Sequence, residues 1–100
     1  MPQPRFKRRT FAVELLPHER RVLQQWNYTP EIQSQLKPHA ASEDIATIKL
    51  NGVDMMYLVS DLNHAIVKRG AYNDEDTIEL CERLEYIDKT GDGKLNAWYG

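Results

Sequence analysis

One pattern occurs twice in this chain, and it constrains the fold more than any other feature. Phe11–Leu23 and Ala46–Leu58 align at an offset of 35 residues, so that Val13 matches Ile48. Each segment begins with alternating apolar and polar residues, passes a tight turn and enters a helical pattern. A unit of this size cannot bury its own apolar face, so we expect the two to share one core. Internal duplication would explain the match, and so would the chance similarity of two amphipathic strand–helix segments.

The local patterns predict two short strands and about four helices. The expected strands are Arg9–Leu15 and Asp44–Leu50, where apolar side chains alternate with polar ones. The expected helices cover residues 16–28, 30–37, 53–69 and 75–87. Pro17, Pro30 and Asn51-Gly52 mark helix starts and turns, and Gly70 marks a helix end. The fold class is therefore α+β: a small, helix-rich domain of two strand–helix–helix units.

Length and composition favour one compact domain. A chain of 100 residues with 41% hydrophobic and 28% charged residues is ordinary for a soluble globular protein. We expect residues 1–8 to form a flexible basic arm, residues 9–87 a single domain, and residues 88–100 a C-terminal loop with an aromatic tail. Because Cys81 is the only cysteine and no long apolar run occurs, we expect a cytoplasmic protein without a membrane span.

The charge is divided unevenly between the two parts of the chain. Residues 1–37 contain seven Lys or Arg and three Asp or Glu, giving +4, whereas residues 38–100 contain six and twelve, giving −6. The sum is the net charge of −2. This polarity points to a protein partner or to self-association as a homodimer, whose exposed strand edge would invite pairing. The net negative charge argues against a free-standing nucleic-acid binder, because such proteins are usually basic overall.

The stretch DKTGDGKLNAWY near the C-terminus has the spacing of an ion-binding loop. Oxygen-bearing groups recur at alternate positions, and a glycine stands sixth. The stretch resembles the twelve-residue loop of the EF-hand calcium-binding family. The resemblance implies these ligands: Asp88, Thr90, Asp92, Lys94 (through its backbone carbonyl) and Asn96.

The same stretch departs from the family at its last position. Tyr99 stands where the family supplies a bidentate glutamate, and only two of the ligands are carboxylates. The resemblance therefore implies calcium affinity of about millimolar strength at best. Ordinary turn chemistry, with glycines after a helix and Asp92 bonded to nearby backbone, is the alternative. On that reading the chain carries no cofactor.

No pattern in the sequence indicates catalysis. The histidines and Cys81 lack the spacing of a metal site, and no glycine-rich phosphate loop occurs. Asp61 and His64 share a helix and could form a trio with Cys81, but Cys81 lies on the expected buried stripe, where thiols are usually inert. We therefore expect a protein that is not an enzyme.

The expected function is that of a small protein-interaction or regulatory module. Aromatic residues and arginines contribute more binding energy than their number suggests. The residues expected to meet a partner lie at the two ends of the chain: Arg5, Phe6, Lys7, Arg8, Arg9, Trp98 and Tyr99. The alternatives are a calcium-binding module and a nucleic-acid-binding accessory protein whose basic arm, helped by Arg20 and Arg21, contacts phosphates.

Overall fold

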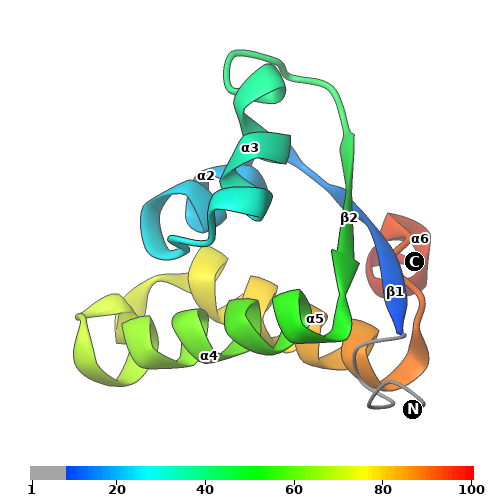
Figure 1. Ribbon diagram of the computed structural model, residues 1–100. Coiled ribbons are helices and arrows are strands. Elements are labelled where there is room, and N and C mark those ends of the chain that lie inside the picture. Colours follow the sequence, from blue (N-terminus) through cyan, green and yellow to red (C-terminus); the bar gives the residue numbers. More distant parts are fainter. Residues whose placement is uncertain (1–8) are drawn as a thin grey trace, which may run out of the picture.

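The computed structural model describes residues 9–100, and the expected arm at residues 1–8 lies outside them. Two helix pairs and a two-stranded ribbon form the three sides of the domain, with α2 and α3 on one side, α4 and α5 on another and the strands on the third (Figure 1). In chain order the elements are β1 (Thr10–Leu15), α2 (Pro17–Trp26), α3 (Pro30–Leu36), the 3₁₀ helix η1 (Lys37–His39), β2 (Ala46–Asn51), α4 (Gly52–Lys68), the 3₁₀ helix η2 (Ala71–Asn73), α5 (Glu75–Thr90) and α6 (Leu95–Tyr99). The α+β fold class expected from the sequence is confirmed.

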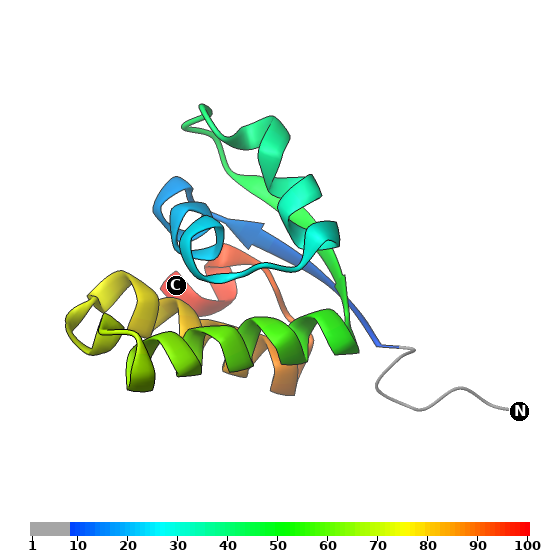
Figure 2. The same ribbon diagram turned by 60° about the vertical axis from the view of Figure 1, so that its left-hand side comes forward.

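The two strands pair antiparallel, and their alternation places the apolar residues on one face. Val13 lies opposite Ile48, and Phe11 lies opposite Leu50. Both pairs are buried against the helices, whereas the residues between them face away from the core. The ribbon extends from the α2–α3 pair to the α4–α5 pair (Figure 2), and the two helix pairs cover its inner face. The shared core expected of the two units is therefore present.

The two strand–helix units match in detail as far as the first helix of each. The Glu19 carboxylate accepts from the backbone N–H of Leu16 at 2.9 Å, and Asp54 accepts from that of Asn51 at 3.2 Å. These pairs are again 35 residues apart, and each closes the N-terminus of its helix. The Asn51 side chain also accepts from the Asp54 N–H at 2.8 Å. Leu16 makes no such bond because its side chain has no acceptor. The units diverge afterwards, since α3 spans 7 residues and α5 spans 16.

Both outer edges of the ribbon are bonded within the chain. On β2, the Gln35 side chain accepts from the Lys49 N–H at 2.7 Å and donates to the Lys49 carbonyl at 2.8 Å. On β1, the Glu14 N–H donates to the Gly93 carbonyl at 2.8 Å. Open strand edges are where chains add to one another. A homodimer stays a prediction, but extending this ribbon across two chains would first break these bonds.

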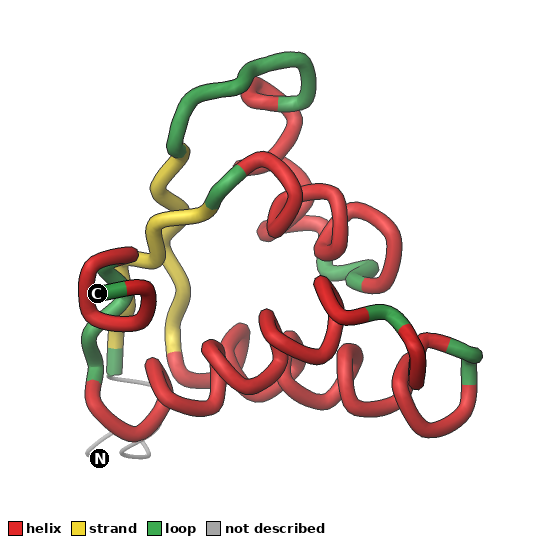
Figure 3. Tube along the Cα trace, turned by 180° about the vertical axis from the view of Figure 1, so that it is seen from behind, coloured by secondary structure: helices red, strands yellow, loops and turns green. Residues whose placement is uncertain are grey.

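The C-terminal residues differ most from the expectation of a loop and tail. Helix α5 continues past Ile87 to Thr90, because no glycine interrupts it before Gly91, which adopts a left-handed conformation with φ of 78°. Residues 95–99 then form α6, which lies beside β1 (Figures 1 and 3). Within residues 9–100, no helix is long and apolar enough to cross a membrane.

Candidate functional site

The residues of the EF-hand-like stretch lie partly in helices and partly in the turn between them. Asp88 and Thr90 belong to the last turn of α5, and Asn96 is exposed in α6. Asp92 accepts from the Lys94 N–H at 3.1 Å, which is the local backbone bond expected of ordinary turn chemistry. Among the described residues, the carboxylates of Asp88 and Asp92 do not converge with a third acidic side chain.

Asp88 is engaged by a residue from the opposite end of the chain. The Arg9 guanidinium lies 3.3 Å from the Asp88 carboxylate and also donates to the Asp88 backbone carbonyl. Arg9 lies against the Phe11 ring as well, 4.9 Å from its centroid. Among residues 9–100, no group of three or more Asp, Glu, His or Cys side chains is placed to hold a metal ion. Calcium binding by this stretch stays a prediction.

Gly93 is required by a close approach of backbone to backbone. A Cβ atom placed on Gly93 would lie 2.1 Å from the Ala12 carbonyl oxygen and 2.9 Å from the Val13 Cα. The Gly93 carbonyl accepts from the Glu14 N–H and, at 3.0 Å, from Arg83. The glycine that suggested a calcium loop therefore has a structural role, since it lets the turn lie directly on β1.

A buried ion pair joins α2, α5 and the C-terminal segment. Arg83 donates to both Glu19 oxygens, at 2.9 and 3.0 Å, and the two side chains are 0% and 1% exposed. The Tyr99 hydroxyl lies 3.1 Å from a Glu19 oxygen and 3.2 Å from a Glu79 oxygen, so its one proton can be donated to either carboxylate. Burial, followed by the Glu19 and Glu79 carboxylates, raises the pKa of Tyr99, so the hydroxyl stays protonated and able to donate.

The residues expected to bind a partner make contacts within the domain where the structure describes them, but Tyr99 is still 44% exposed, and partner binding by these residues stays a prediction. The Trp98 ring packs on Tyr86 with centroids 5.6 Å apart, and Tyr99 is held by the ion pair. Arg9 bonds to Asp88, whereas Arg5, Phe6, Lys7 and Arg8 lie outside the described residues.

Arg20 is not available to phosphates, contrary to what the sequence suggested. It is 3% exposed and donates to three carbonyls at 3.1 Å or less, those of Leu15, Ser42 and Asp44. These bonds fasten the loop between η1 and β2 to the start of α2. The loop has no regular structure of its own, so the buried guanidinium satisfies backbone acceptors that strands or helices would otherwise pair. Arg20 thus supports the fold and leaves the nucleic-acid alternative without one of its residues.

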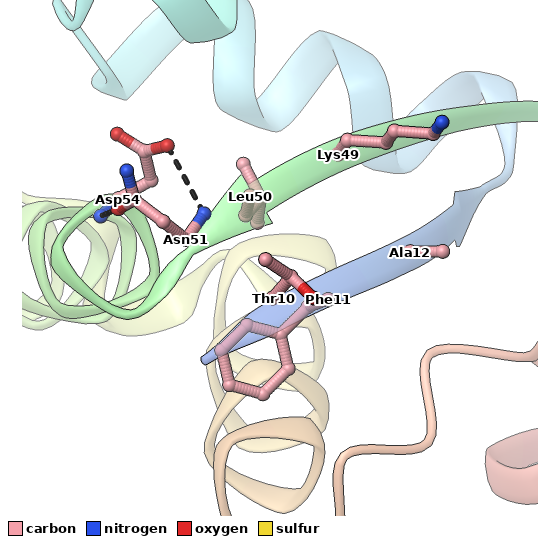
Figure 4. Close-up of a pocket in the computed structure, with 7 residues that line it drawn as sticks. All are labelled: Thr10, Phe11, Ala12, Lys49, Leu50, Asn51 and Asp54. Atoms are coloured by element: carbon pink, nitrogen blue, oxygen red, sulfur yellow. Dashed lines mark hydrogen bonds between the residues drawn. The ribbon is translucent and has the colours of Figure 1, made fainter. Parts of the chain in front are cut away.

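One pocket lies where the ribbon meets α4. It has a volume of about 490 Å³ and is lined by Thr10, Phe11, Ala12, Lys49, Leu50, Asn51 and Asp54 (Figure 4). Asp54 is turned back to the Asn51 backbone, and the Lys49 amino group points away from both residues (Figure 4). The polar groups of this pocket do not converge on a common point, so it has no evident ligand chemistry.

A second pocket lies on the surface between the α2–α3 turn and α4, and we call it the tyrosine pocket. It has a volume of about 350 Å³, and its lining residues are Tyr28, Thr29, Pro30, Tyr57 and Asp61. The two tyrosines are 68% and 51% exposed. Two aromatic side chains, a proline and a carboxylate therefore border one hollow on the surface.

A buried asparagine bonds to two residues that line the tyrosine pocket. Asn27 is 1% exposed, and its amide donates to Asp61 at 2.9 Å and to the Thr29 hydroxyl at 3.2 Å. Its carbonyl groups accept from the Thr29 N–H and from the Gln33 side chain. The α2–α3 turn and α4 are thus tied together, and Asp61 is held in one orientation beside Tyr57.

No local pattern in the sequence indicates the tyrosine pocket. Tyr28 and Tyr57 are 29 positions apart, and only the packing of the turn on α4 brings them to one place. A buried Asn27 between two helices could have indicated a polar link, because polar side chains are rarely buried without partners. In the Asp61–His64–Cys81 trio, Asp61 bonds to Asn27, Cys81 lies 3.7 Å from Glu85 and His64 is exposed; burial, followed by Glu85, raises the pKa of Cys81 to about 11.

Comparisons with known proteins supply no family or relative. No protein-family model, curated protein or solved structure matches this chain.

Proposed function

We propose that this protein is a non-enzymatic interaction module that binds a basic segment of a partner protein at the tyrosine pocket. The observation that carries the proposal is the pair of exposed tyrosines beside a carboxylate that a buried asparagine holds in place. Tyrosine is enriched among residues that dominate binding energy, since its ring gives a large contact area at small entropic cost.

The rigidity of the pocket supports a binding role. The Asn27 bonds fix the turn that carries Tyr28 and the helix face that carries Asp61. A surface that is already ordered loses little conformational freedom when a partner arrives. The pocket therefore has the two properties of an anchor point, namely exposed aromatic area and a preformed shape.

Charge complementarity indicates the kind of partner. Glu31, Asp54 and Asp61 lie on the elements around the pocket, whereas α3 contains no lysine or arginine and α4 contains none before its last residue, Lys68. Complementary potentials favour encounter with a positively charged segment and disfavour acidic ones. The partner is therefore a protein with an exposed Lys- or Arg-containing stretch.

A display library of random peptides tests the proposal. Peptides selected on the wild-type protein should lose at least about tenfold in affinity for Tyr57→Ala, because truncating a central aromatic anchor removes a large part of the binding energy. The matched control is Tyr72→Ala, which removes another exposed tyrosine, 66% exposed, from η2. Its affinity should stay within about twofold of wild type.

Two results would contradict the proposal. One is a library that yields no binding peptide. The other is a set of peptides that binds Tyr57→Ala and wild type equally. Circular dichroism of both variants confirms that a loss of binding is not a loss of folding, which is expected because both side chains are exposed.

A further inference from the structure

We infer that the tyrosine pocket recognises a cationic side chain, lysine or arginine, and that Asp61 is the residue that selects for its charge. This inference rests on the proposed function and names the chemical group that enters the pocket. It follows from three features that meet there: aromatic faces, an oriented carboxylate and the lack of a salt bridge to that carboxylate from residues 9–100.

The aromatic lining is the first feature. Tyr28 and Tyr57 reach the pocket from different elements and both line it. A cation within about 6 Å of an aromatic ring is attracted by the negative face of the ring, and Lys and Arg are the side chains that exploit this. The apolar stem of either side chain also packs well against tyrosine and proline, while its charged end stays near water.

The second feature is the state of Asp61. One of its oxygens, Oδ2, accepts from Asn27 Nδ2 at 2.9 Å, and Asp61 also lines the pocket. A carboxylate has about four acceptor sites, so one bond to Asn27 leaves most of them free for an incoming donor. Asp61 can therefore accept from an ammonium or guanidinium group placed between it and the tyrosines.

The third feature is that no Lys or Arg among residues 9–100 forms a salt bridge with Asp61. The salt bridges within residues 9–100 are Arg9–Asp88 and Arg83–Glu19, and neither involves α4. Arg69, the nearest arginine along the sequence, lies instead over the Trp26 ring at 5.9 Å. The carboxylate is thus bonded to a neutral amide and has no salt-bridge partner among the described residues.

The experiment compares small probe compounds of matched shape. N-acetyl-lysine methylamide, N-acetyl-arginine methylamide and the uncharged N-acetyl-norleucine methylamide are titrated separately into the folded protein. Tyr57 ring and Asp61 amide resonances are followed by NMR. The two cationic probes should bind with millimolar dissociation constants, about tenfold more tightly than the norleucine probe, because both the rings and the carboxylate favour a cation.

Substitution of Asp61 separates charge selection from shape. Asp61→Asn keeps the size of the side chain and an oxygen for Asn27, and it should reduce the preference for cations over norleucine to about twofold. The control is Glu43→Gln, an exposed residue of the η1–β2 loop, which makes the same change in net charge. Its preference should remain at about tenfold.

The outcomes distinguish the inference from the proposed function. Equal binding of the norleucine and cationic probes at the pocket would overturn cation recognition while leaving the docking site intact. An unchanged preference in Asp61→Asn would overturn the role of Asp61. No shift of Tyr57 with any probe would overturn the inference as well, and the peptide selection would then decide alone whether the pocket is a docking site.

Discussion

Replacing Arg83 by methionine should destabilise the domain strongly, because it leaves a buried carboxylate without its cation. Arg83 makes two bonds to Glu19 and a third, through its other terminal nitrogen, to the Gly93 carbonyl. Methionine fills a similar volume without donors. Glu19 then keeps only the Leu16 N–H at 2.9 Å and the Tyr99 hydroxyl at 3.1 Å.

The structure places the size of this effect near the lower end of the usual range. Removing one partner of a buried ion pair costs about 3–5 kcal/mol. Two of the four hydrogen bonds to Glu19 remain in the variant, so we expect a loss of about 3 kcal/mol in the free energy of unfolding. For a domain of this size that loss corresponds to a fall in Tm of about 12–24 °C.

Urea unfolding of three proteins tests the reasoning: wild type, Arg83→Met and the double variant Glu19→Gln with Arg83→Met. The neutral glutamine removes the stranded charge and keeps an oxygen for the Leu16 N–H. The double variant should therefore be more stable than Arg83→Met by about 1–2 kcal/mol, although it contains one more substitution. The reasoning is refuted if Arg83→Met costs less than about 1 kcal/mol, or if the double variant is no more stable than the single one.

Three further predictions follow from the C-terminal segment and the core. Gly93→Ala should release the turn from β1, since the new Cβ would lie 2.1 Å from the Ala12 oxygen; hydrogen exchange should show loss of protection at the Glu14 amide, and unchanged protection would contradict it. Burial raises the pKa of Cys81 to about 11 from 9.0, so the folded state holds this proton more tightly than the unfolded state; stability should fall as pH rises through that interval, and the decline should be smaller in Cys81→Ala. Calcium at about 5 mM should leave the Gly93 amide resonance in place because Asp88 is paired with Arg9, and a saturable shift would instead support the EF-hand resemblance.

Much of the fold could be predicted from the sequence because its signals are local. Alternation marked the strands, and Pro17, Pro30 and Asn51-Gly52 marked where helices begin. The extent of α5 was underestimated, because Asp88 and Thr90 read as loop ligands although nothing before Gly91 stops a helix. Such local rules describe three or four residues at a time, which is enough for caps and turns.

The position of the C-terminal segment could not be predicted by the same rules. It depends on the Glu19–Arg83 pair, whose members are 64 residues apart, and each looks like a surface residue of its own helix. One signal was present: Arg83 lies three residues after Leu80 and four before Ile87, on the apolar stripe of α5. A charge on such a stripe needs a buried partner, which here is Glu19 of α2.

The closure of β2 by a single side-chain amide has a chemical consequence for the ageing of the protein. Gln35 uses both ends of its amide, accepting at the Lys49 N–H and donating to the Lys49 carbonyl. Hydrolysis of that amide to glutamate would replace the donor nitrogen by a carboxylate oxygen, which cannot donate and would repel the Lys49 carbonyl oxygen. An old or heat-stressed sample would thus lose one of the two bonds that close β2, and association of chains through this edge should increase with storage time.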